Sequence, residues 1–160
     1  MNYFLILALV LFVYMNLWLL FALVNKRNDV AEIAWGLGFV LLAWTSYLLS
    51  GQFNFSALII NTLVSIWGLR LAWHIYRRNR GKPEDRRYQA WRQQWGKWFV
   101  LRSYLQVFIL QGIFLFLIVS PVLLINYYAG ERLGMFLVPG LAVWLGGLLF
   151  DAVGVRQLEC

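Results

Sequence analysis

Two acidic residues at the start of an apolar segment are the first candidates for chemistry in this sequence. Asp29 and Glu32 lie three residues apart and precede a long apolar run, so a helix that begins there carries both carboxylates on one face. A partly buried carboxylic acid at this place could donate a hydrogen bond to a substrate carbonyl. The same spacing also fits helix capping, with Asn28 or Asp29 as the N-cap and Glu32 as the acid of a capping box.

A basic stretch between residues 77 and 102 is the strongest charge signal. It holds nine Lys and Arg residues against two acids, so its net charge equals the +7 of the whole chain. Arginine binds phosphate through paired hydrogen bonds, which favours a phosphorylated ligand such as a nucleotide cofactor. Attraction of the stretch to anionic lipid headgroups explains the same charge. A short loop tied at both ends to membrane segments argues against nucleic acid as a partner.

The basic stretch also has the pattern of a short amphipathic helix. Tyr88, Trp91 and Trp95 fall on one helical face. Pro83 suits the first helical position and Gly96 the position after the last turn. We therefore expect an interfacial amphipathic helix that lies in the headgroup region.

Three more ionisable residues lie inside or at the end of apolar segments. Arg70 and His74 are one helical turn apart. Arg70 either extends its guanidinium to the headgroups or faces the bundle interior, where it marks a ligand path or a buried pair. His74 and Asp151 receive no assigned role from the sequence.

The composition excludes several kinds of site. One His and one Cys in 160 residues cannot assemble a zinc site of the usual type, so no metal is expected. Residues 35–38 (WGLG) carry two glycines, but they lie inside an apolar run. We interpret them as helix packing rather than as a dinucleotide-binding motif.

Membrane-spanning helices must position these residues. The chain is 62% hydrophobic and 13% charged, whereas soluble domains are about 25% charged. Because each bilayer crossing takes ~20 apolar residues, we predict an all-α, polytopic transmembrane helical bundle with about five spans in a single domain, residues 1–160. The expected spans are residues 3–24, 30–50, 57–76, 103–128 and 135–151, with a basic cytosolic loop at residues 77–97.

The placement of Lys and Arg in the short loops sets the expected orientation. The loop after the first span carries Lys26 and Arg27, the next loop has neither residue type, and the third loop is strongly basic. We therefore place the N-terminus outside and the C-terminus in the cytosol, in a multi-pass protein of a membrane such as the bacterial inner membrane.

Four strings of the sequence resemble an uncharacterised membrane family that is grouped with the steroid 5-alpha-reductases. They are residues 29–39 (DVAEIAWGLGF), 68–88 (GLRLAWHIYRRNRGKPEDRRY), 101–108 (LRSYLQVF) and 150–158 (FDAVGVRQL). The second string is long and specific, and the resemblance covers essentially the whole chain.

This resemblance implies a bundle that NADPH enters from the cytosolic side, where it reduces a carbon–carbon double bond conjugated to a carbonyl in an apolar, enone-type small molecule. Carried over by position, Glu32 or Asp29 stands for the catalytic acid that holds the carbonyl oxygen. Trp67 falls nearest the place of the family's carbonyl-binding tyrosine, which argues against steroid reduction. The residues expected to bind the cofactor are Arg70, Arg77, Arg78, Arg80 and Arg102.

The resemblance also predicts a missing part. Family members continue for about a hundred further residues, or two or more spans, with an Arg-His-Pro-Asn-Tyr-Phe-Gly-Glu type motif that supplies most cofactor contacts. This chain has no such string, so we expect a truncated member that forms no stable NADPH pocket and is catalytically silent alone, unless a second chain or an oligomer completes it. Two alternatives stay open: a non-catalytic small membrane protein that binds anionic lipid, and a fragment of an isoprenylcysteine-methyltransferase-like enzyme that uses S-adenosylmethionine.

Overall fold

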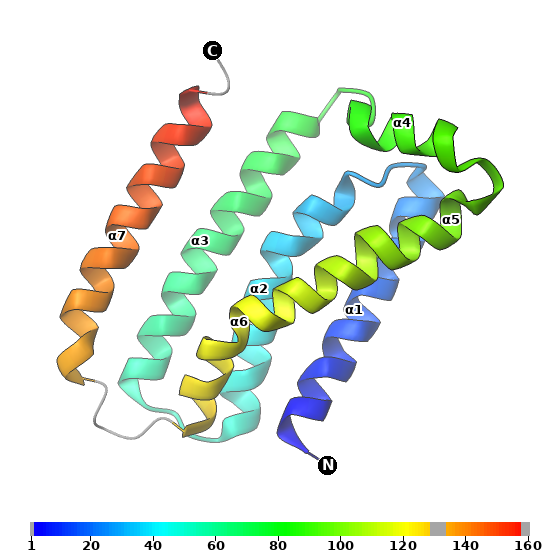
Figure 1. Ribbon diagram of the computed structural model, residues 1–160. Helices are drawn as coiled ribbons and strands as arrows, with labels where there is room; N and C mark the ends of the chain where they lie inside the picture. The colour runs from blue at the N-terminus through cyan, green and yellow to red at the C-terminus, as the bar shows by residue number, and fades with distance from the viewer. Residues whose placement is uncertain (1, 129–133, 158–160) are drawn as a thin grey trace.

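A computed structural model of the chain describes residues 2–128 and 134–157, and the regular structure in these residues is helical throughout. Seven α-helices follow one another in the described part (Figure 1). They are α1 (Tyr3–Asn25), α2 (Val30–Ser50), α3 (Phe55–Asn79), α4 (Arg86–Trp95), α5 (Phe99–Arg102), α6 (Leu110–Tyr128) and α7 (Gly134–Gln157). A short 3-10 turn, Gly96–Trp98, joins α4 to α5, and a π-helical segment, Ser103–Ile109, joins α5 to α6.

Four helical stretches in the described residues are long and apolar enough to cross a membrane. They are α1, α2, α3 and the continuous stretch from Arg86 to Tyr128 that ends in α6. The predicted all-helical, multi-pass membrane bundle is therefore confirmed. The fifth predicted span lies within α7, whose apolar part, Val138–Asp151, is shorter than these four, so the count of five spans and the orientation stay predictions.

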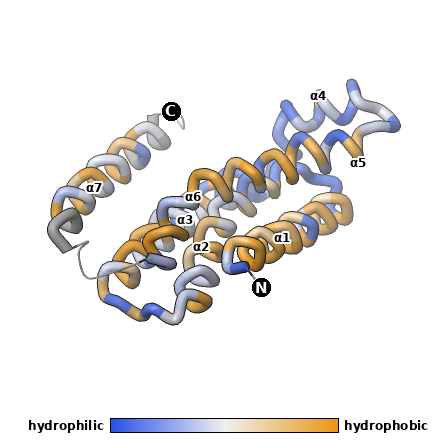
Figure 2. The backbone as a smooth tube through the Cα atoms, turned by 60° about the horizontal axis from the view of Figure 1, so that its bottom comes forward, coloured by the Kyte–Doolittle hydropathy of each residue, from blue (hydrophilic) through white to orange (hydrophobic). Residues whose placement is uncertain are grey.

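The helices pack around α2, which contacts α1, α3 and α6. Figure 1 shows α3 and α7 running in the same direction, with α6 crossing in front of α2. The end of α7 lies at the same end of the bundle as α4 (Figure 1). Figure 2 shows that hydrophilic residues concentrate at this end, over α4 and its flanking loops, whereas α1 and α6 are mainly hydrophobic. We call it the basic end.

Two glycines let α2 and α3 touch through their backbones. A Cβ atom built on Gly68 would lie 2.7 Å from the carbonyl oxygen of Gly36, and one built on Gly36 would lie 2.8 Å from the carbonyl oxygen of Gly68. Gly38 faces α6, where its Cβ would lie 2.5 Å from a methyl carbon of Leu115. The interpretation of residues 35–38 as helix packing is therefore confirmed.

A buried polar cluster joins four helices at the end of the bundle opposite α4. The side chains of Asn61 and Asn126 hydrogen-bond to each other, and Asn126 Nδ2 also donates to Ser46 Oγ at 3.0 Å. The hydroxyl of Tyr3 shares a hydrogen bond with Ser46 Oγ. Polar groups within a membrane need such internal partners, so this cluster fixes how α1, α2, α3 and α6 meet.

Candidate functional site

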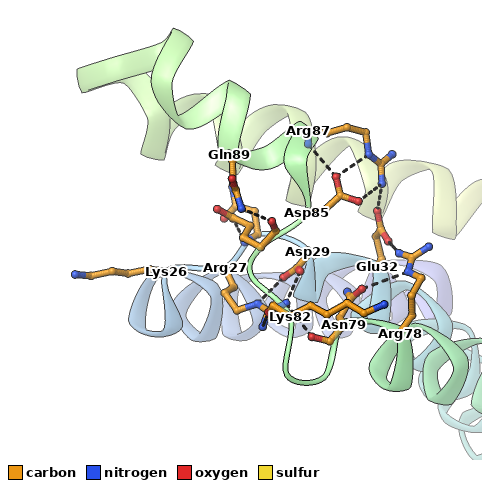
Figure 3. Close-up of polar contacts among 12 residues, drawn as sticks. Lys26, Arg27, Asp29, Glu32, Arg78, Asn79, Lys82, Asp85, Arg87 and Gln89 are labelled. Carbon is orange, nitrogen blue, oxygen red and sulfur yellow. Dashed lines mark hydrogen bonds and ion pairs between the residues drawn. The ribbon is translucent and has the colours of Figure 1, made fainter.

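A network of ion pairs holds the basic end together, and Figure 3 shows most of its members. Four carboxylates, from the start of α2 and the loop before α4, each accept hydrogen bonds from arginine. We call this set the charged network. Its members are Arg27, Asp29, Glu32, Arg78, Glu84, Asp85, Arg87 and Arg92.

Asp29 stands at the N-cap position of α2, but its side chain caps nothing. Instead Arg27 binds it with two hydrogen bonds, of 3.1 Å to Oδ1 and 2.7 Å to Oδ2, and the Asp29 side chain is only 1% exposed. The hydrogen bond from Arg27 to Asp29 raises the pKa of the Arg27 guanidinium. Arg27 also donates to the carbonyl oxygens of Lys82 and Asn79, so this one arginine joins the α1–α2 turn to the end of α3.

Glu32 lies between two arginines from other elements. Arg78 of α3 donates to Oε2 at 2.8 Å and Arg87 of α4 donates to Oε1 at 2.7 Å. The predicted N-cap position of Asp29 is therefore confirmed, but the capping box is wrong, because the carboxylates of Asp29 and Glu32 bind guanidinium groups and not the backbone at the start of the helix.

Glu84 connects three segments at once. Its Oε1 accepts a hydrogen bond of 2.7 Å from the backbone N–H of Asn28, and Arg92 of α4 donates to both of its oxygens. The guanidinium of Arg92 also lies 4.1 Å from the centre of the Phe99 ring, close enough for a cation–π contact. Asn28 Nδ2 in turn donates to Ser103 Oγ at 2.7 Å, at the start of the π-helical segment.

The helix that carries the aromatic face is present, but it begins later than expected. It starts at Arg86 with Asp85 as its N-cap, not at Pro83, and Gly96 follows its last residue, as predicted. Tyr88 is only 4% exposed and belongs to the core cluster, the set of buried apolar side chains that pack together inside the bundle, and Trp91 packs against this cluster. At least two residues of this face therefore contact the bundle, which a pattern alone could not distinguish from contact with lipid.

Asp85 is expected to control how firmly α4 is ordered. Its Oδ1 accepts hydrogen bonds from the backbone N–H and the Nε of Arg87, and the Arg87 side chain lowers the pKa of Asp85 below its ordinary value of 3.8. Replacing Asp85 by alanine should cost about 1 kcal/mol of local stability, measured as faster amide exchange in α4. Asp85→Asn, which keeps an accepting oxygen, should exchange more slowly than Asp85→Ala, and equal rates would contradict the capping role.

The sign of the pH effect follows from the same contact. Because the pKa of Asp85 is lower in the folded chain than in the unfolded chain, its stabilisation is complete above the ordinary value of 3.8 and is lost as the pH falls through the lowered pKa. The protection factors of the α4 amides, which are corrected for the intrinsic pH dependence of exchange, should therefore be insensitive to this group near neutral pH and fall only in acid.

The five arginines expected to bind a cofactor divide into two groups. Arg78 pairs with Glu32, and Arg70 pairs with Asp151 of α7. Asp151, which the sequence left without an assigned role, therefore has an ion-pair partner. Within the residues that the structure describes, the other three are exposed and have no carboxylate within ion-pair distance. These three are Arg77, Arg80 and Arg102.

An apolar cavity lies between the spanning helices, on the side of α7. It has a volume of about 390 Å³, and residues of α2, α3, α6 and α7 line it. Trp67 on α3 and Leu148 on α7 lie three residues before Arg70 and Asp151, or one helical turn. The Arg70–Asp151 pair therefore stands at the end of the cavity nearer the basic end, and the Nε of Arg70 is buried with no hydrogen-bond partner.

Asp29 and Glu32 reach the same end of the bundle as the arginines, as expected, but each is held in its own ion pair. Glu32 lies seven residues before Phe39, the residue of α2 that lines the apolar cavity. Their catalytic role stays a prediction. In the described residues, no three His, Cys, Asp or Glu side chains gather in a way that could hold a metal ion.

Comparisons with known proteins give one match. No curated protein and no solved structure matches the chain. A family model described as a protein of unknown function, DUF1295, matches residues 17–160. Since the matched residues make up most of the sequence, the chain belongs to the DUF1295 family, whose function is unknown.

Proposed function

We propose that this chain forms the membrane part of a reductase-like protein, which acts on apolar, enone-type substrates with NADPH. The four strings that resemble the relatives of the steroid 5-alpha-reductases support the reaction class. The observation that carries the proposal is the order of features along α3: an apolar cavity at Val64 and Trp67, an ion pair at Arg70, and unpaired arginines at Arg77 and Arg80.

This order fits the two halves of such a reaction. Arg70 lies seven residues before Arg77, about 10 Å along the helix at ~1.5 Å per residue. An apolar substrate would occupy the cavity, which Trp67 and Trp144 help to line. Phosphate groups would stay at the basic end, where water and lipid headgroups keep the cost of their charge low.

The donors at the basic end suit a phosphorylated cofactor. The carboxylates of the charged network occupy Arg27, Arg78, Arg87 and Arg92, so these guanidinium groups are already committed. Phosphate would be held by the unpaired arginines, which present donors in the planar arrangement that phosphate accepts. NADPH supplies a hydride when it is bound. The unpaired set consists of Arg77, Arg80 and Arg102.

Arg70 is the charged group best placed to act on a substrate. It stands one helical turn from the cavity, and its buried Nε has no acceptor. We propose that this N–H orients a carbonyl oxygen of the substrate, while Asp151 holds the guanidinium in place. Asp29 and Glu32, the other proposed acids, accept hydrogen bonds from arginines, and a carbonyl would have to displace these donors to reach them.

Binding of NADPH to the purified chain in lipid nanodiscs tests the proposal without requiring turnover. We expect this binding to be weak, because the string that supplies most cofactor contacts in the family is absent from the chain. NADPH should bind more tightly than NADH, because only NADPH carries the 2′-phosphate. Arg77→Gln with Arg102→Gln should weaken NADPH binding by about tenfold for each arginine, or about a hundredfold together, since a charged hydrogen bond contributes at least ~1.5 kcal/mol. A matched pair, Arg86→Gln with Lys97→Gln, removes two other exposed charges from the same stretch and should change binding little.

Three results would contradict the proposal. Equal affinity for NADPH and NADH would show that the arginines do not bind the 2′-phosphate. An equal loss in the matched pair would show general charge attraction instead of a site. Tighter binding of S-adenosylmethionine than of NADPH would favour the methyltransferase alternative.

A further inference from the structure

A second groove lies at the basic end, and its lining residues differ from those of the apolar cavity. It has a volume of about 320 Å³ and is formed by the end of α1, the start of α2 and the end of α3. Its lining changes character along its length. Apolar walls come from Trp18, Phe21, Val30 and Ile33, and polar groups come from Asn25, Arg27, Asp29, Tyr76, Asn79 and Arg80.

This change follows the helix axes. On α1, Trp18 and Phe21 precede Asn25 near the basic end, and on α2, Ile33 lies one helical turn further from that end than Asp29. In a bundle whose helices cross a bilayer, Trp18, Phe21 and Ile33 lie nearer acyl-chain depth than the polar groups do, and Val30 lies beside Asp29 at the boundary. A ligand that fills the groove must therefore have an apolar part and a polar part in that same order.

The charge of the polar part favours an anion. Arg27 and Asp29 neutralise each other in their two-bonded pair. This leaves Arg80 as the net charge among the lining residues, and no described carboxylate pairs with it. Asn79 adds an amide Nδ2 that is buried and donates to no described group.

We propose that this groove binds one anionic glycerophospholipid, with its phosphate at Arg80 and Asn79 and an acyl chain along Phe21 and Ile33. A soluble phosphate compound would leave the four apolar walls without a contact, whereas a phospholipid uses both parts of the groove. The groove is separate from the apolar cavity beside α7, and a bound lipid goes beyond the proposed reductase function. Arg80 belongs to both proposals, so a lipid phosphate and a cofactor phosphate would compete for it.

Lipid retention measures the site directly. The chain is reconstituted in nanodiscs of equal phosphatidylglycerol and phosphatidylcholine, extracted in mild detergent, and analysed by native mass spectrometry. The unchanged chain should keep one phosphatidylglycerol. Arg80→Gln should reduce this retention by about tenfold, the effect of losing one charged hydrogen bond, and Arg80→Lys should restore part of it.

The matched control is Arg77→Gln. It removes the same charge from the same helix, and Arg77 is exposed and does not line the groove, so retention should stay unchanged. Ile33→Trp fills the apolar part without changing charge and should also expel the lipid. Helical content by circular dichroism establishes that each variant is folded.

The outcomes separate the sources of phosphate. Equal loss in Arg77→Gln and Arg80→Gln would show attraction to the whole basic stretch and overturn the proposal. Full retention in a folded Ile33→Trp variant would place the lipid elsewhere. Displacement of phosphatidylglycerol by NADPH or by inorganic phosphate, dependent on Arg80, would assign this arginine to a soluble ligand. If the unchanged chain retains the lipid but does not bind NADPH, the result would contradict only the proposed function.

Discussion

Replacing Gly68 by leucine is expected to prevent the helix bundle from forming in its observed arrangement. A Cβ at residue 68 would lie 2.7 Å from the carbonyl oxygen of Gly36 and 2.9 Å from a methyl carbon of Val40. The Gly36 oxygen belongs to the backbone of α2, so it cannot move aside as a side chain would. Overpacking costs ~1–3 kcal/mol where side chains can yield, and we expect about 3 kcal/mol or more here, measured by unfolding in mixed micelles.

Two further variants make the expected result specific to this contact. Gly68→Ala adds only the Cβ and should be destabilised less than Gly68→Leu. Gly146→Leu adds the same side chain to α7 at a position where a Cβ meets no described atom within 4 Å, so its stability should stay near that of the unchanged chain. Equal destabilisation by Gly146→Leu would show that added bulk, not the α2–α3 contact, is responsible.

The spanning helices could be predicted because their signal is local. A run of apolar residues of bilayer length becomes a helix whatever it packs against, since lipid offers no hydrogen bonds to the backbone. The small residues of the second span likewise predicted close packing. These residues did not show which helix packs against the second span, because Gly68 approaches Gly36 only once the two helices are paired.

The arrangement of the site depended on contacts between distant residues. The spacing of Asp29 and Glu32 favours a capping box, yet the arginines that bind Glu32 lie 46 and 55 residues further along the chain. Asp151 finds its partner 81 residues earlier, at Arg70. A sequence shows that such charges need partners but not which partner each one meets.

The aromatic face of α4 illustrates the same limit at the level of an element. Tyr88 and Trp91 have the period of an amphipathic helix, and that period predicted the helix correctly. An apolar face can be buried by lipid or by protein with the same pattern, and here Tyr88 packs into the core cluster. The charged network supplies the reason, because Arg87 and Arg92 of α4 both bind acids that lie outside this helix.

Replacing Arg27 by methionine should be the most destabilising change in the charged network. Methionine keeps much of the apolar length of the side chain but leaves the Asp29 carboxylate, 1% exposed, without a guanidinium. Removing one partner of a buried ion pair costs ~3–5 kcal/mol. Because Arg27 is 29% exposed and water can follow it, we expect the lower value, about 3 kcal/mol, in the free energy of unfolding in mixed micelles.

A double-mutant cycle distinguishes the ion pair from the other contacts of Arg27. Every Arg27 variant also loses the hydrogen bonds to the carbonyl oxygens of Lys82 and Asn79, so the single change overstates the pair. Asp29→Asn removes the buried charge, and the double variant Arg27→Met with Asp29→Asn should therefore be more stable than Arg27→Met alone. If the free-energy changes of the two single variants simply add in the double variant, the Asp29 carboxylate becomes solvated once Arg27 is removed. Its carboxylate would then be open to a ligand, which would strengthen its candidacy as the acid that holds a substrate carbonyl.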